Sequence, residues 1–117
     1  MREIHVDLAH LREAAGGDVF GPGGDRLGTL ADVYLDNDSG SPEWIEVKTG
    51  LLQRRLVPLD KAQVAQQRVD VAYERRLVDS APKVTTRGGV VQPDEEQRLY
   101  EYYGIPGEHT PHPLRTA

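Results

Sequence analysis

The chain has 117 residues, enough for one domain, and its 12 glycines and 8 prolines favour short strands joined by tight turns over a helical bundle. With 19 acidic and 14 basic residues, its net charge of −5 argues against general binding to nucleic-acid backbones. The sequence has no cysteine, which excludes disulfides and thiolate chemistry and favours a cytoplasmic location. It has neither an N-terminal apolar signal segment nor an apolar run of about 18 residues, so we expect no export signal and no transmembrane segment.

Apolar periodicity, turn residues and helix caps predict a mainly β chain with a short helix near each end. The predicted elements, in chain order, are a helix over 7–15, strands over 18–20, 26–36, 43–49 and 54–59, short apolar strands at Val64 and over 68–73, a helical turn over 74–79, a linker over 83–92 and a helix over 93–103 capped by Gly104. The tail over 105–117 contains three prolines and no periodicity, so we expect it to be disordered.

The longest predicted strand does not alternate cleanly between apolar and polar residues. Leu30 and Val33 fall on opposite parities, so they would point to opposite faces of a regular strand. If both are buried, the strand needs a bulge near Ala31 or Asp32. Gly28 in the same strand permits a sharp bend, which is how small barrels turn their corners.

Alternation in the strand over 43–49 places two sets of side chains on opposite faces. The inward set is Ile45 and Val47, and the outward set is Trp44, Glu46 and Lys48. An outward tryptophan needs a cover, and we expect the apolar stripe of the C-terminal helix to provide it. That stripe consists of Leu99, Tyr102 and Tyr103. A protein partner or a second copy of the chain is the alternative cover.

Several short motifs follow one another in a characteristic order along the chain. They are Asp25-Arg26-Leu27-Gly28, Asp32-Val33-Tyr34-Leu35-Asp36, Pro42-Glu43-Trp44-Ile45-Glu46-Val47-Lys48-Thr49-Gly50, Val57-Pro58-Leu59 and the segment from Val78 to Ala81-Pro82. In this order and spacing they resemble the PRC-barrel family over about 17–82, and the run over 95–104 is similar to the helical extension of bacterial stand-alone members. The resemblance implies a small closed β-barrel of about six short strands. It divides the chain into a helical segment (1–16), the barrel (17–82), a linker with a helix (83–104) and the disordered tail (105–117).

That family includes the cytoplasmic domain of the photosynthetic reaction-centre H subunit and the C-terminal domain of the ribosome-maturation factor RimM, in which the barrel acts as an adaptor. The resemblance implies a non-catalytic adaptor that binds another protein or, as a homodimer, itself. The alternatives are a RimM-like accessory factor of RNA or ribosome maturation and a reaction-centre-like accessory domain of electron transport. The residues predicted for protein interaction are Trp44, Glu46, Lys48, Arg54, Arg55, Leu99, Tyr102 and Tyr103. A basic patch of Arg54, Arg55 and Arg68 would favour the RNA alternative.

Residue types that carry chemistry predict no catalytic, cofactor or metal site. The four histidines, which are His5, His10, His109 and His112, all lie outside the predicted barrel. The last two are separated by Thr110 and Pro111 with no carboxylate or cysteine at ligand spacing, so we expect them to belong to a flexible tail and bind no metal. The run that begins at Asp36 lacks the spacing of a calcium loop, and the glycines over 21–24 form a turn without the lysine of a phosphate loop. No nucleophile has an adjacent base, so we expect no enzyme activity.

Overall fold

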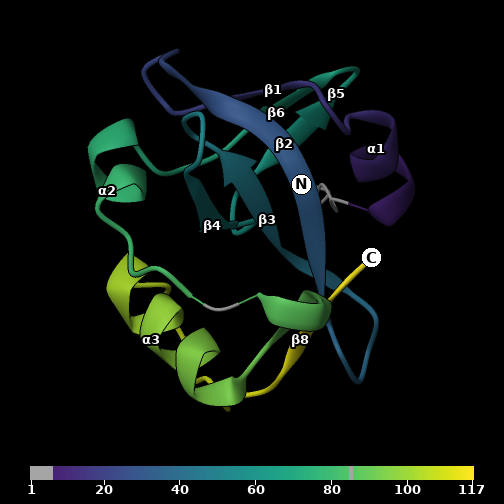
Figure 1. Ribbon diagram of the computed structural model, residues 1–117, viewed down its shortest axis with the longest axis vertical. Coiled ribbons are helices and arrows are strands. Elements are labelled where there is room, and N and C mark those ends of the chain that lie inside the picture. Colours follow the sequence, from purple (N-terminus) through teal and green to yellow (C-terminus); the bar gives the residue numbers. More distant parts are fainter. Residues whose placement is uncertain (1–6, 85) are drawn as a thin grey trace.

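The computed structural model describes residues 7–84 and 86–117, and it is built around one sheet of eight strands. Its elements in chain order are α1 (Leu8–Glu13), β1 (Asp18–Phe20), β2 (Arg26–Asp36), β3 (Pro42–Lys48), β4 (Arg54–Pro58), β5 (Gln63–Ala65), β6 (Arg68–Asp70), α2 (Arg75–Asp79), the 3₁₀ turn η1 (Arg87–Gly89), β7 (Val90–Val91), α3 (Pro93–Tyr103) and β8 (Leu114–Thr116). The long strand β2 curves across the molecule, and α3 lies apart from α1 (Figure 1). The prediction of a mainly β fold with short helices is confirmed.

The sheet has the strand order β4-β3-β2-β1-β6-β5, and β8 adds to β2 on one side and to β7 on the other. The pairing of β1 with β6 is parallel, whereas all the other pairs are antiparallel. Within the described residues no backbone pairing joins β4 to β5, so the sheet is not closed by hydrogen bonds. The structure therefore does not confirm the predicted closed barrel of six strands, and the linker and the tail contribute two strands that the sequence analysis did not place.

The irregular strand β2 contains the bulge that its apolar pattern predicts. Its register with β3 passes from Leu30 opposite Val47 to Asp32 opposite Glu46, which skips Ala31. The extra residue lets Leu30 and Val33 both turn inward, where they are buried.

Gly28 is required for a close approach between β2 and β3. A Cβ atom at this position would lie 2.1 Å from the carbonyl oxygen of Lys48. Only a glycine allows β2 to approach the end of β3 this closely.

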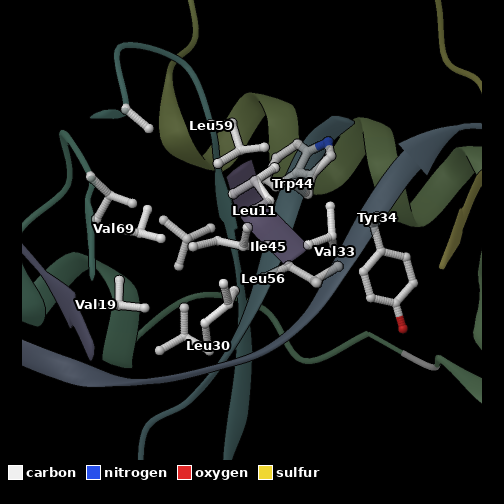
Figure 2. Packing of buried hydrophobic residues seen from close by; sticks show 14 of the residues in the cluster. Leu11, Val19, Leu30, Val33, Tyr34, Trp44, Ile45, Leu56, Leu59 and Val69 are labelled. Atoms are coloured by element: carbon white, nitrogen blue, oxygen red, sulfur yellow. The ribbon is translucent and has the colours of Figure 1, made fainter. Parts of the chain in front are cut away.

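Strand β3 is buried on both faces over most of its length. Ile45 and Val47 have no exposed surface and face the apolar interior, where Figure 2 shows Ile45 among side chains from β1, β2, β4 and β6. On the opposite face, Trp44 and Glu46 are also buried, with 2% and 7% of their surface exposed. The predicted alternation is confirmed, but the face predicted to be outward is covered by the rest of the chain.

The helix ends follow their capping residues. Asp7 accepts a hydrogen bond from the backbone nitrogen of His10 at 2.9 Å and so caps α1. Helix α3 begins with Pro93, carries acidic residues in its first turn and ends at Gly104, which has a φ of 66°. None of the helices in the described part of the chain combines the length and the hydrophobicity that a membrane span requires.

The tail differs from the prediction of disorder over 105–117. Leu114–Thr116 forms β8, which pairs with residues 34–36 at the end of β2 and with β7. The side chain of Leu114 is fully buried. A three-residue strand is too short to show apolar periodicity, and β8 contributes only one buried leucine. The sequence pattern therefore does not reveal this strand.

Candidate functional site

The predicted cover of Trp44 is confirmed. The ring centroids of Trp44 and Tyr103 are 5.9 Å apart, and Figure 2 shows the indole beside the helix that carries Tyr103. The hydroxyl of Tyr103 donates a 2.7 Å hydrogen bond to the carbonyl of Leu56, which ties the end of α3 to β4. Tyr102 likewise donates to the carbonyl of Leu77, and Leu99 has no exposed surface.

This packing corrects the predicted interaction surface. Trp44, Leu99 and Tyr103 are buried within the chain, so they offer no surface to a partner in this fold. Glu46 was expected to point outward, yet it is buried beneath Arg54, whose Nη1 lies 3.4 Å from a carboxylate oxygen of Glu46. Strand alternation predicts on which side of the sheet a side chain lies, but it does not predict whether other parts of the chain cover that side.

The hairpin between β3 and β4 presents the most exposed large apolar side chains of the described residues. Leu51 is 85% exposed and Leu52 is 94% exposed. They sit in a tight turn in which the backbone nitrogen of Thr49 donates to the carbonyl of Gln53 at 3.0 Å. Neither leucine was predicted to be a site residue, although two adjacent leucines directly after Gly50, in a turn, are a visible signal in the sequence.

Three cationic residues flank this hairpin tip, and all belonged to the predicted interaction set. Lys48 and Arg54 are exposed at the ends of the two strands and face each other across the hairpin. The guanidinium of Arg55 donates to the carbonyls of Arg54 and Asp79 at 3.0 and 3.4 Å. A pocket of about 170 Å³ lies beside the tip, between the start of β4 and the segment that follows α2. We call Lys48, Leu51, Leu52, Arg54 and Arg55 the hairpin tip.

The three arginines that would favour RNA binding, Arg54, Arg55 and Arg68, do not form an unpaired basic patch. Arg68 lies on β6, where it pairs with Asp70 at 2.9 Å and stacks on the ring of Phe20 at 3.9 Å. Arg54 pairs with Glu46, as described above. Two of the three arginines therefore lie beside carboxylates, which lowers the positive potential that a phosphate backbone would meet.

A second feature brings together acidic and imidazole side chains from distant parts of the chain. Nε2 of His109 lies 2.6 Å from Oε1 of Glu96, and Nε2 of His112 lies 2.6 Å from Oε1 of Glu43 and 3.9 Å from Oε2 of Glu96. We call Glu43, Glu96, His109 and His112 the carboxylate–histidine cluster. It lines a groove of about 670 Å³ together with Trp44, Leu59 and Tyr100, among others.

Each member of this cluster is positioned by a different element. Glu43 begins β3, and Glu96 lies in the first turn of α3, where its side chain is 1% exposed. The two histidines lie in the segment between α3 and β8, which the pairing of β8 with β2 holds against the sheet. The prediction that the two histidines belong to a flexible tail without carboxylates at ligand spacing is therefore wrong. The carboxylates beside them come from positions that are distant in sequence.

The surroundings of His112 favour its positive charge. Burial by itself lowers the pKa of this imidazole, but hydrogen bonds to the Thr110 carbonyl and to Glu43, with the charge of Glu96, outweigh burial and raise the pKa to about 9. His112 therefore carries a proton at neutral pH and pairs with the acidic side chains around it.

His10 is not part of the cluster. His10 is exposed on α1, where Nδ1 lies 3.0 Å from Asp7. His5 lies outside the described residues. The turn after Asp36 is closed by that side chain, which accepts a hydrogen bond from the backbone nitrogen of Asp38 at 2.9 Å, as expected for a hairpin turn.

Comparison with known proteins gives the family of the chain. A family model described as the PRC-barrel domain matches residues 8–77, from α1 into α2. A comparison with curated proteins found no match to the chain. The matched range includes the hairpin tip and Glu43, whereas the other three members of the carboxylate–histidine cluster lie beyond it. Since the match covers more than half of the chain and agrees with the observed strands, the chain belongs to the PRC-barrel family.

Proposed function

We propose that the protein is a non-catalytic cytoplasmic adaptor that docks another protein through the hairpin tip. The observation that carries this proposal is the exposure of Leu51 and Leu52, at 85% and 94%, in a chain whose other leucines are buried or partly buried. Burying one leucine side chain contributes roughly 1.5–3 kcal/mol, so the pair would contribute about 3–6 kcal/mol to docking a partner.

The hairpin presents these leucines on a rigid support. Strands β3 and β4 pair without a register shift from Trp44 opposite Pro58 to Lys48 opposite Arg54. Preorganised side chains lose little conformational entropy on binding, which favours affinity. An adaptor of this kind needs no catalytic residues, and the tip contains only apolar and cationic side chains.

Charge specifies the kind of partner. The whole chain carries a net charge of −5, whereas the hairpin tip contributes three cations, of which Arg54 is paired with Glu46. We therefore propose a protein partner with an apolar pocket edged by carboxylates, because complementary charges speed association and exclude wrong partners. A second copy of the chain is less suited to this tip, since two tips would bring like charges together.

The test begins with a photo-crosslinking amino acid placed at Leu52 in living cells, with Val90 as the matched position. Val90 is a large apolar side chain with 38% of its surface exposed, and it lies on β7, outside the hairpin. The proposal expects a protein that crosslinks from position 52 and not from position 90. That protein is then purified and its affinity is measured by calorimetry.

The affinity measurement compares the wild type with Leu51→Ser/Leu52→Ser and with Val90→Ser. Losing two buried leucines at about 1.5 kcal/mol each weakens binding by at least about 100-fold, and the Val90 variant binds like the wild type. Equal binding by the double variant overturns the proposal. If light scattering shows a dimer that dissociates in the double variant, the occupant of the hairpin tip is a second copy of the chain. If RNA is the species crosslinked at position 52, the occupant is nucleic acid. Either result contradicts the proposed protein partner.

A further inference from the structure

We infer that the carboxylate–histidine cluster is a binding site for one divalent transition-metal ion, with Zn²⁺ the best fit, whose protein ligands are Glu96, His109 and His112, with Glu43 beside His112. The ligand atoms of the first three lie within 4.8 Å of one another. Two imidazoles with carboxylates are a donor set that Zn²⁺ accepts, whereas Mg²⁺ and Ca²⁺ prefer oxygen ligands alone. The site is independent of the hairpin tip.

Glu96 supplies an observation that points to a ligand. Its side chain is 99% buried, and among the described residues no donor lies within hydrogen-bond distance of Oε2. That oxygen lies 3.9 Å from Nε2 of His112, on the side where the two histidines converge. Leaving a buried carboxylate oxygen without a partner costs free energy, and a metal ion among these three side chains would satisfy it.

The imidazole rings are held in orientations that suit coordination through Nε2. Nδ1 of His112 lies 2.9 Å from the carbonyl of Thr110, an acceptor, so this nitrogen keeps its proton, and the proton that a bound ion would displace from the charged ring is the one on Nε2. The ring of His109 stacks on that of Tyr100 with centroids 3.7 Å apart and an angle of 8° between the planes. These contacts fix the rings as outer-shell partners do in zinc proteins.

The distances fit a tetrahedral site after small side-chain movements. Zinc bonds of about 2.1 Å place neighbouring tetrahedral ligand atoms about 3.4 Å apart. Among the three ligands, the contact of His109 with Glu96 is 2.6 Å and that of His112 with Glu96 is 3.9 Å. Opening the first distance and closing the second, each by less than about 1 Å, reaches the required spacing.

Such an ion would fasten the C-terminal segment to the rest of the molecule. The two histidines belong to the segment before β8 and Glu96 belongs to α3, while Glu43 on β3 contacts His112. One ion would therefore join this segment to α3 and stabilise the pairing of β8 with β2. Ligation of this type couples metal binding to folding of the segment that it holds.

The experiment uses the full chain without a histidine tag, treated with a chelator and then dialysed. Zn²⁺ is titrated in by calorimetry, and Co²⁺ is used as a spectroscopic probe of tetrahedral geometry. We expect one equivalent of Zn²⁺ to bind, a visible Co²⁺ spectrum of tetrahedral type, and slower hydrogen exchange of the β8 amides with Zn²⁺ present. Excess Mg²⁺ should not displace the ion.

Variants separate this site from other histidines. His112→Ala and the isosteric Glu96→Gln are each expected to weaken Zn²⁺ binding by at least about 100-fold, since even outer-shell partners contribute roughly 10- to 100-fold. His10→Ala is the matched control, because His10 also lies beside a carboxylate, and it should bind as the wild type does. Circular dichroism shows whether each variant is folded. If His112→Ala does not fold, the Zn²⁺ affinity of Glu96→Gln tests the inference by itself.

Four results would overturn the inference. The first three are the absence of Zn²⁺ binding by the wild type, unchanged binding by folded Glu96→Gln, and a loss of binding in His10→Ala equal to that in His112→Ala. The fourth is displacement of Zn²⁺ by Mg²⁺. That result would mean that the ion binds at a site with oxygen ligands alone and not at the two imidazoles.

Discussion

Replacing Trp44 with alanine tests whether α3 is part of the hydrophobic core. The indole lies on β3 with 2% of its surface exposed, and it contacts Tyr103 at the end of α3 with ring centroids 5.9 Å apart. Truncation to alanine therefore opens a cavity between the sheet and the helix. If Trp44 instead belonged to a surface that a partner covers, the same change would leave the stability of the isolated chain almost unaltered.

The magnitude follows from the size of the side chain. A buried tryptophan replaced by alanine costs about 3–5 kcal/mol of unfolding free energy. An unfolding entropy of about 2.1 cal/mol/K per residue gives about 0.25 kcal/mol/K for a chain of 117 residues, so each kcal/mol lowers Tm by about 4 °C. The expected fall in Tm is therefore about 12–20 °C.

The assay is thermal and urea denaturation followed by circular dichroism at two protein concentrations. Leu52→Ala is the matched control, because this leucine is 94% exposed and its truncation should change stability by less than about 0.5 kcal/mol. A fall in Tm of less than about 2 °C for Trp44→Ala would refute the reasoning, as would a fall of the same size in the control.

Gly28→Ala would place a Cβ atom 2.1 Å from the carbonyl oxygen of Lys48 and is expected to cost about 1–3 kcal/mol in urea denaturation, whereas Gly23→Ala, with open space around it, should be nearly neutral. Equal effects would contradict the close approach of β2 and β3. Gly104→Ala is expected to cost about 1–2 kcal/mol because this residue has a φ of 66°, and a neutral result would contradict that cap geometry. Burial raises the pKa of Tyr73 from 10.0 to about 12, so the unfolded chain loses this proton first and stability falls as pH rises from about 10 to about 12. Tyr73→Phe should remove that part of the alkaline decline in urea midpoints, and an unchanged decline would contradict the shift.

Local pattern was sufficient to predict most of the elements. The apolar alternation of β3, the acidic first turn of α3 and its glycine cap each depend on neighbouring residues, and each appears where expected. The bulge in β2 is the most specific of these predictions, because Leu30 and Val33 cannot both face inward without an extra residue between them. The family was also accessible from the order of short motifs.

Pattern was less informative about what covers a face. Parity placed Trp44 and Glu46 correctly opposite Ile45, yet both are buried, because α3 packs on Trp44 through Tyr103 and Arg54 lies over Glu46. The hairpin tip was half predicted: its cations were named from the sequence, but its two leucines were not, since exposure of an apolar residue is a property of the folded surface.

The sequence by itself determined the six strands from β1 to β6, the helix ends and the family, because these depend on residues close together in the chain. Only the tertiary structure decided the sheet edges, the strand in the tail and the carboxylate–histidine cluster. Glu43 and His112 are 69 residues apart, and their contact exists because β8 pairs with the end of β2 and α3 returns across β3. No spacing rule along the chain contains such a contact, because it depends on how separate elements pack against one another.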